Sequence, residues 1–268
     1  MADLPTTWRA AWVSPTADPT PAGRRPAYRL RGRFELTAPV RRATLFATAH
    51  GLYEAELNGV RVSDAELTPG YTEYQHHTQV QSYDVTPLLT DGENVLDALL
   101  ADGWYRGQVG VGRASDQWGT ETAFVAQLEL EHEDGSTAVV ATDESWQWSP
   151  SHITVADLIE GQHEDRRLPD THTWRPVAVN DRGHDSLVGS PAPAVRPVQE
   201  LHPVRVTELR PGVHVVDLGQ NLNGHVRLTD LGPAGTELVL THAEWLGADG
   251  DVTTDHLRPD LPFLPEPL

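Results

Sequence analysis

Two large aromatic side chains, a carboxylate and a guanidinium follow an apolar segment, in a pattern that could hold a sugar. The apolar run 95–100 leads into an Asp-Gly turn signal at Asp102, and Trp104, Tyr105 and Arg106 come directly afterwards. Aromatic rings stack on the apolar face of a flat ligand, and arginine presents a rigid fork of hydrogen-bond donors. We therefore predict a carbohydrate-binding corner with these candidate residues: Asn58, Asp102, Trp104, Tyr105, Arg106 and Trp118.

Most of these candidates also have a purely structural interpretation. Trp104 and Tyr105 could pin a loop onto the core, since aromatic residues pack inside proteins more often than they bind ligands. Asp102 suits the first position of an Asp-Gly turn. Arg106 could form an ion pair with Asp102 or with Glu121. The sequence leaves the structural and the ligand-binding interpretations open.

No catalytic residue is predicted. Hydrolysis of a glycosidic bond needs two facing carboxylates, but the 39 acidic residues make some close pair unavoidable and therefore uninformative. The sequence contains no G-x-S-x-G motif and no cysteine, so neither a serine elbow nor a thiol nucleophile is available. Solvated surface or turn positions are the better interpretation of the acids.

No metal ligand and no cofactor are predicted either. His242 and Glu244 would share one face of a strand, which favours a hydrogen-bonded structural pair. Asp217, Asn221 and Asn223 surround a glycine turn, but the sequence has no D-x-D-x-D-G calcium loop. Calcium held by Asp, Asn and backbone oxygens is the alternative that these residues would suit.

The composition restricts the partners and the compartment. The 268 residues carry 20 Lys and Arg against 39 Asp and Glu, a net charge of −19, which argues against nucleic acid or an anionic membrane surface as partner. A neutral ligand is not disfavoured. The sequence has no apolar stretch near 20 residues and no apolar segment after Met1, so we expect no membrane span, no signal peptide and a cytoplasmic location.

Short alternating segments predict an all-β protein. Apolar and polar residues alternate in runs separated by Gly, Asp and Asn turns about every 8–12 residues, without a long helical pattern. This favours a jelly-roll-like β-sandwich followed by a partial second β-sandwich, because about four strands are too few to close one. The predicted organisation is an extended leader (1–25), the sandwich (26–180), a Gly- and Pro-rich linker (181–200) and an incomplete second β domain (201–268), with its strands at 204–207, 213–218, 226–231 and 236–242.

Several motifs in fixed order resemble one known family. LNGVRVSDAELTPGYTEY (57–74) and YDVTPLLTDGENVLDALLADGWYRG (83–107) resemble the N-terminal accessory domain of bacterial α-L-rhamnosidases, glycoside hydrolase family 78. TDESW (142–146) and ADLIEGQHEDRR (156–167) fit the same order. The stretch 217–250 resembles the start of that family's next, concanavalin-like β domain.

The resemblance implies a role inside a larger enzyme. The family's catalytic carboxylates lie on an (α/α)6 barrel far downstream and hydrolyse terminal α-L-rhamnosides with inversion. No helical repeat occurs before Leu268. We therefore expect a non-catalytic N-terminal portion, inactive alone, that supports the fold, partners the missing C-terminal catalytic domain and binds rhamnose-containing glycans. A free-standing lectin-like module is the first alternative, and an active hydrolase with its site in these domains is the second.

Overall fold

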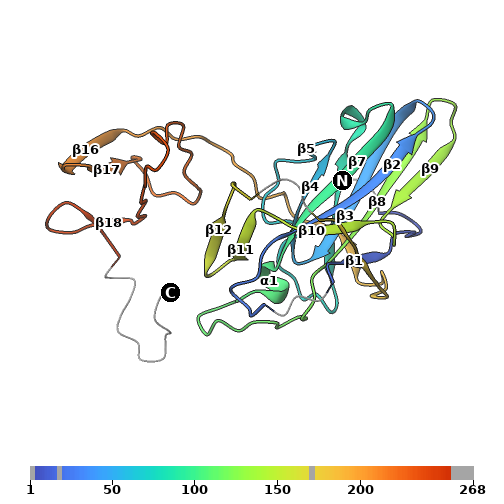
Figure 1. Ribbon diagram of the computed structural model, residues 1–268, viewed down its shortest axis with the longest axis horizontal. Coiled ribbons are helices and arrows are strands. Elements are labelled where there is room, and N and C mark those ends of the chain that lie inside the picture. Colours follow the sequence, from blue (N-terminus) through green and yellow to red (C-terminus); the bar gives the residue numbers. More distant parts are fainter. Residues whose placement is uncertain (1–3, 17–19, 169–172, 255–268) are drawn as a thin grey trace. The chain divides into compact units, whose positions relative to one another are not determined.

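A computed structural model describes residues 4–16, 20–168 and 173–254, which fold almost entirely as β structure (Figure 1). The chain divides into two units, the first ending at Arg196 and the second beginning at Pro197. The all-β prediction is confirmed. Residues 255–268, the end of the predicted second domain, lie outside the described residues.

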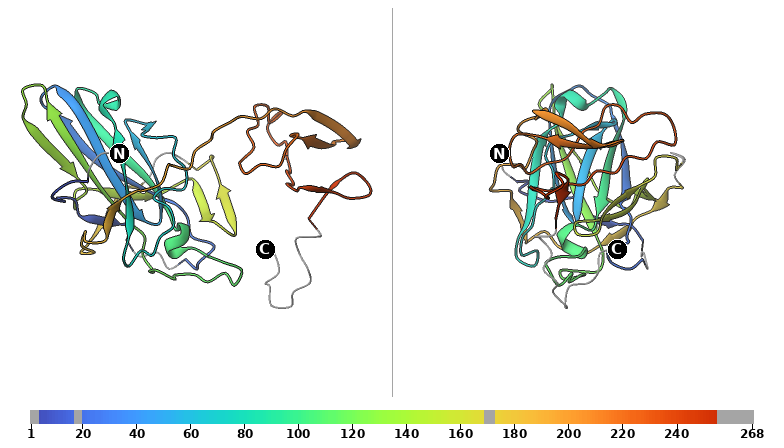
Figure 2. Two further views of the ribbon diagram at one scale, coloured as in Figure 1. Left: turned by 180° about the vertical axis from the view of Figure 1, so that it is seen from behind. Right: turned by 90° about the vertical axis from the view of Figure 1, so that its left-hand side faces the viewer.

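Two sheets form the jelly-roll-like sandwich of the first unit. Strands pair antiparallel throughout both sheets, except that β15 runs parallel to β6. Seen from opposite sides in Figures 1 and 2, the short helix α1 lies at one end of the sandwich and the β8–β9 turn lies at the other. The first sheet has the order β14 (Ala178–Asn180), β1 (Trp12–Ser14), β8 (Ala123–His132), β3 (Val40–His50), β6 (Thr78–Asp84) and β15 (Leu187–Gly189), with β9 (Thr137–Ala141) also paired to β8. The second has the order β13 (Arg175–Pro176), β10 (Gln147–Pro150), β2 (Tyr28–Leu36), β7 (Gly92–Ala101), β4 (Leu52–Leu57) and β5 (Val60–Arg61).

The core lies between these sheets because one face of each strand is apolar. Along β2, Leu30 is buried while Arg29 and Arg31 on the other face are not, as a period of two requires. Leu45 of β3 is paired with Leu128 of β8, and both are 1 % exposed. Full burial of each such side chain contributes about 1.5–3 kcal/mol to folding.

The outer face of the first sheet is also covered. Trp12, Phe46 and Leu187 belong to a second buried cluster on this face, with Trp8 packed against it. Strand β1 lies between β14 and β8, inside the segment that the sequence predicts as an extended leader. Strand β15 lies inside the predicted linker. Both segments therefore contribute strands and side chains to the first unit.

The second unit is sparse in regular structure among the described residues. Two of its four predicted strands are confirmed, since β16 (Arg205–Arg210) and β17 (Val213–Asp217) form a hairpin. The prediction of strands at 226–231 and 236–242 is wrong, because neither segment pairs with another. Apolar residues of these segments, such as Val226 and Val239, are exposed, and a strand without a ladder partner gains no cross-strand stabilisation. The remaining pairs are β18 (Trp245–Leu246) with β19 (Val252–Thr253), and in the first unit β11 (Ile153–Asp157) with β12 (Gly161–Glu164).

Helix α1 (Gly103–Arg106) follows directly on the central strand β7. Gly103 has φ +53°, and a Cβ atom there would lie 2.5 Å from Leu52 Cγ, so this tight turn against β4 requires glycine. The other short helix among the described residues is the 3-10 turn η1 (Thr86–Leu88), with Pro87 in its first turn. Neither helix is long and apolar enough to cross a membrane, and the described residues contain no other that could.

Candidate functional site

Asp102 and Arg106 form a buried ion cluster at the end of β7. The Asp102 side chain is 1 % exposed and accepts a hydrogen bond from Arg106 Nε at 2.7 Å. Arg25 Nη1 lies 3.2 Å from the other Asp102 oxygen and 2.9 Å from Asp116 Oδ1. Burial raises the pKa of the Asp102 carboxyl, and both guanidinium groups act in the opposite direction. Of the two ion pairs that the sequence leaves open for Arg106, the structure contains the one with Asp102.

Tyr105 belongs to a buried stack of rings beneath this corner. Its ring lies parallel to that of His50, with centroids 4.5 Å apart, and His50 in turn stacks on Trp12 at 4.5 Å. Arg182 donates to His50 Nδ1 at 3.0 Å and to the Tyr105 hydroxyl at 3.3 Å. Burial, and secondly Arg182, lower the pKa of His50 to about 3. We call Trp12, His50 and Tyr105 the ring stack; it is neutral and well packed.

Trp104 and Trp118 lie nearer the surface and meet at Tyr71. The Tyr71 side chain is 54 % exposed, and its ring centroid lies 6.1 Å from that of Trp104 and 6.4 Å from that of Trp118. Both tryptophans are half-buried. Trp118 also contacts Tyr74, whose ring meets Tyr105 of the ring stack edge-on. We call Tyr71, Trp104 and Trp118 the aromatic rim.

Asn58 does not belong to this corner. Strand pairing places Leu57, the residue before Asn58, opposite Leu96 in the middle of β7, whereas α1 follows the end of that strand. The Asn58 side chain is used in a turn instead. Asn58 Oδ1 accepts a hydrogen bond from the Val95 amide at 2.9 Å, and Asn58 Nδ2 donates to Leu88 O at 2.9 Å and to Asn94 Oδ1 at 2.8 Å. With φ of 54°, Asn58 holds a hairpin turn and ties it to η1.

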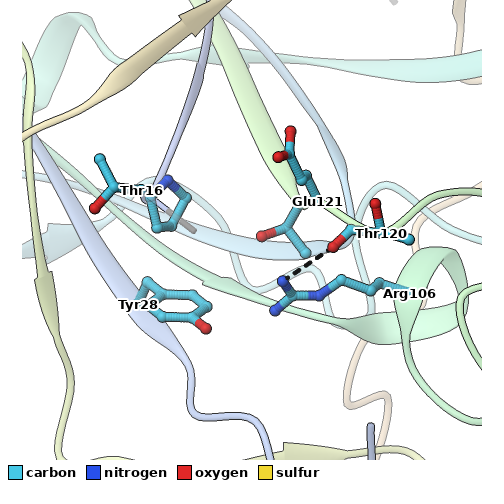
Figure 3. A pocket seen from close by; sticks show the side chains of 7 residues that line it. Thr16, Tyr28, Arg106, Thr120 and Glu121 are labelled. Atoms are coloured by element: carbon cyan, nitrogen blue, oxygen red, sulfur yellow. Dashed lines mark hydrogen bonds between the residues drawn. The ribbon is translucent and has the colours of Figure 1, made fainter. Parts of the chain in front are cut away.

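A small pocket opens beside Arg106, with a volume of about 140 Å³. Figure 3 shows the Arg106 guanidinium reaching into it between the Tyr28 ring and Thr120, where Nη1 donates to the Thr120 carbonyl at 3.5 Å. Thr122 and the partly exposed carboxylate of Glu121 line it as well. The sequence gives no signal for this pocket, because its walls come from segments more than a hundred residues apart at their extremes.

Of the six predicted site residues, Asp102, Trp104, Tyr105 and Arg106 are neighbours on α1 and the turn before it. Trp118 is connected to them by ring contacts with Tyr71 and Tyr74, whereas Asn58 lies elsewhere. Sequence reasoning missed Tyr71, although the TPGYTEY run around it stands out. It also missed His50, Arg25 and Arg182, for which no local signal exists. Within the described part of the chain, no three His, Asp or Glu side chains gather closely enough to hold a metal ion.

Comparison with known families identifies the first unit. Residues 38–208 match the family model described as the α-L-rhamnosidase N-terminal domain. This chain belongs to the α-L-rhamnosidase family. Residues 207–261 match a second model of the same enzymes, the bacterial α-L-rhamnosidase concanavalin-like domain. The sequence-based resemblance to the N-terminal region of these enzymes is confirmed.

Individual α-L-rhamnosidases agree in sequence and fold. An α-L-rhamnosidase of Streptomyces avermitilis is 41 % identical over 94 % of this chain and 26 % of its own length, and one of Formosa agariphila is 30 % identical over 94 % and 29 %. The crystal structure of the S. avermitilis enzyme complexed with L-rhamnose superposes with a TM-score of 0.78 over 87 % of this chain and 24 % of that one. The Aspergillus terreus α-L-rhamnosidase gives 28 % identity and a TM-score of 0.74, over 80 % and 26 %. The chain thus spans about a quarter of the α-L-rhamnosidases it matches.

Proposed function

We propose that this chain is a non-catalytic portion of an enzyme that hydrolyses terminal α-L-rhamnosides with inversion, and that it binds rhamnose-containing glycans through the aromatic rim. The observation that carries the proposal is the rim itself. Tyr71 contacts both Trp104 and Trp118, and all three rings are partly exposed. Tyr74 connects this rim to Tyr105 of the buried ring stack.

A pre-packed rim suits sugar recognition for an energetic reason. Tyr74 contacts Tyr71 and Trp118, and Tyr71 in turn contacts Trp104. The rings are therefore already packed, and little side-chain freedom is lost when a ligand lies on them. A 6-deoxyhexose such as rhamnose offers a C–H face and a methyl group, which such rings can cover. The ligand is uncharged, so the net charge of −19 does not oppose its approach.

The ion cluster argues against catalysis by Asp102. Its carboxylate is 1 % exposed and is held by Arg106 and Arg25, so it is not available to protonate a leaving group or to attack a sugar. The predicted catalytic carboxylates of the family belong to the downstream catalytic domain, which we propose as the partner of this chain. The chain on its own should release no nitrophenol from an aryl α-L-rhamnoside.

The test is an NMR titration of the purified chain with L-rhamnose, with glucose as the reference sugar. We expect saturable, rhamnose-selective shifts and about tenfold weaker binding for Trp104→Ala, the upper end of what one aromatic contact contributes. Trp245→Ala is the matched control, because Trp245 is 65 % exposed in the second unit. Absence of binding by the folded chain, equal weakening by both variants, or nitrophenol release would overturn the proposal.

A further inference from the structure

The pocket beside Arg106 is separate from the aromatic rim and has room for one six-membered ring. It lies at the end of α1. Its other walls are Pro15 and Thr16 after β1, Tyr28 at the start of β2, and residues 120–122 before β8. Its volume is about 140 Å³. A cavity of about 150 Å³ holds one six-membered ring such as benzene. The pocket therefore limits a ligand to one compact unit.

Arg106 offers this pocket donors that the protein leaves incompletely used. A guanidinium has five N–H groups. Arg106 Nε is bonded to Asp102 at 2.7 Å, whereas the hydrogen bond that Nη1 makes within the described part of the chain is the long 3.5 Å contact to Thr120 O. Nη2 lies 2.5 Å from Asp102 Oδ1 as an ion pair but makes no well-aligned hydrogen bond. Buried polar groups in native proteins are normally satisfied, so the guanidinium has capacity for a ligand oxygen.

The charges around the pocket favour a neutral ligand. Asp102 already balances Arg106, and Asp116 balances Arg25 behind it. Glu121 at the mouth has a 59 % exposed side chain and lies 3.7 Å from Arg182. The charges of these three arginines and three carboxylates thus cancel. The Glu121 carboxylate, which lines the pocket together with Arg106, would repel an anion and can accept hydrogen bonds from hydroxyl groups.

We propose that this pocket binds a single neutral monosaccharide unit. Arg106 donates to one of its oxygen atoms, Glu121 accepts from a hydroxyl group, and the hydroxyls of Thr120 and Thr122 complete the wall. The inference goes beyond the proposed function, because the pocket shares no residue with the aromatic rim and binding here does not need the rim.

The experiment reads the pocket and the rim separately. The chain, labelled at threonine methyl groups and at tryptophan indole N–H groups, is titrated with L-rhamnose and, as an anionic sugar of similar size, with D-glucuronate. We expect saturable shifts of Thr120 and Thr122 with L-rhamnose and weaker binding of D-glucuronate. Trp104→Ala should leave these shifts unchanged, whereas it weakens binding at the rim.

Glu121→Gln tests the charge argument at an exposed position, where the fold is not at risk. Loss of a hydrogen bond to a charged acceptor should weaken L-rhamnose binding in the pocket about tenfold. Glu144→Gln, also exposed, is the matched control and should change nothing. Absence of shifts at Thr120 and Thr122, or tighter binding of D-glucuronate than of L-rhamnose, would overturn the proposal. Shifts confined to Trp104 and Trp118 would overturn it and still support binding at the rim.

Discussion

Arg182 donates a hydrogen bond to Nδ1 of His50 at 3.0 Å, across 132 residues of sequence. An arginine guanidinium can only donate hydrogen bonds, so His50 Nδ1 must be unprotonated and accept with its lone pair. The single ring proton must therefore be on Nε2. Thr78 Oγ1 lies 3.4 Å from that nitrogen. The ring is packed between Trp12 and Tyr105. The structure thus requires His50 to be neutral.

This requirement predicts a loss of stability in mild acid. The pKa of His50 is lowered to about 3 in the folded chain, from 6.5. Below about pH 6.5 the unfolded chain takes up a proton on this ring and the folded chain does not, so folding weakens as the pH falls towards 3, by at most about 1.4 kcal/mol per pH unit. Urea denaturation of the wild type and of His50→Gln at pH 7, 6 and 5 measures the effect.

The His50→Gln chain should be less stable at pH 7, because the ring stack loses its central ring. The difference between the two chains should shrink as the pH falls, since only the wild type carries the proton-linked cost. The carboxylates and the other histidines are present in both chains, so their contributions to the pH dependence of stability cancel in the comparison. A difference independent of pH would contradict a neutral, shielded His50.

Replacing Asp102 by Asn should destabilise the first unit strongly. The substitution leaves Arg106 buried without a counter-ion, and Arg25 with Asp116 alone. Removal of one partner of a buried ion pair costs about 3–5 kcal/mol. Glu93→Gln is the control, because its pair with Arg33 is exposed on both sides and should contribute less than about 1 kcal/mol. Equal free energies of unfolding for the two variants would show that the cluster is not needed for stability.

Gly119 should be intolerant of alanine because of the ring stack. A Cβ atom there would lie 2.4 Å from the Tyr105 hydroxyl oxygen, so either Tyr105 or the loop carrying Trp118 would have to move. We expect a loss of about 1–3 kcal/mol and shifted NMR signals of both rings. Gly112→Ala, whose Cβ would meet nothing within 4 Å, should change stability by less than about 0.5 kcal/mol. Unshifted ring signals in Gly119→Ala would contradict this packing.

Asn58→Ala should lower stability without affecting sugar binding. The side chain makes three hydrogen bonds, to Val95, Leu88 and Asn94, and the residue has positive φ. Their loss should cost about 1–3 kcal/mol in thermal or urea denaturation. The exposed Asn223→Ala in the second unit should be neutral. Weakened L-rhamnose binding by a folded Asn58→Ala chain would return Asn58 to the ligand site.

The sequence by itself was enough for the long central strands of the first unit and for the family, but not for β1 and β15, which lie in the predicted leader and linker. Strands such as β2 and β8 are predictable because alternation with a period of two is a local property. The family is predictable because several motifs occur in a fixed order. The same local reasoning failed at 226–231 and 236–242, since a strand exists only when another strand supplies its hydrogen bonds, and local alternation says nothing about that partner.

Only the tertiary structure decided which candidate side chains face outwards. Asp102, Trp104, Tyr105 and Arg106 are adjacent in the sequence, yet Asp102, Tyr105 and Arg106 are buried and Trp104 is half-exposed. What separates them are contacts across many residues, such as Arg25 with Asp102 and Arg182 with His50. Such contacts arise when the loops at one end of the sandwich converge. Their path depends on the packing of both sheets, which no local pattern contains.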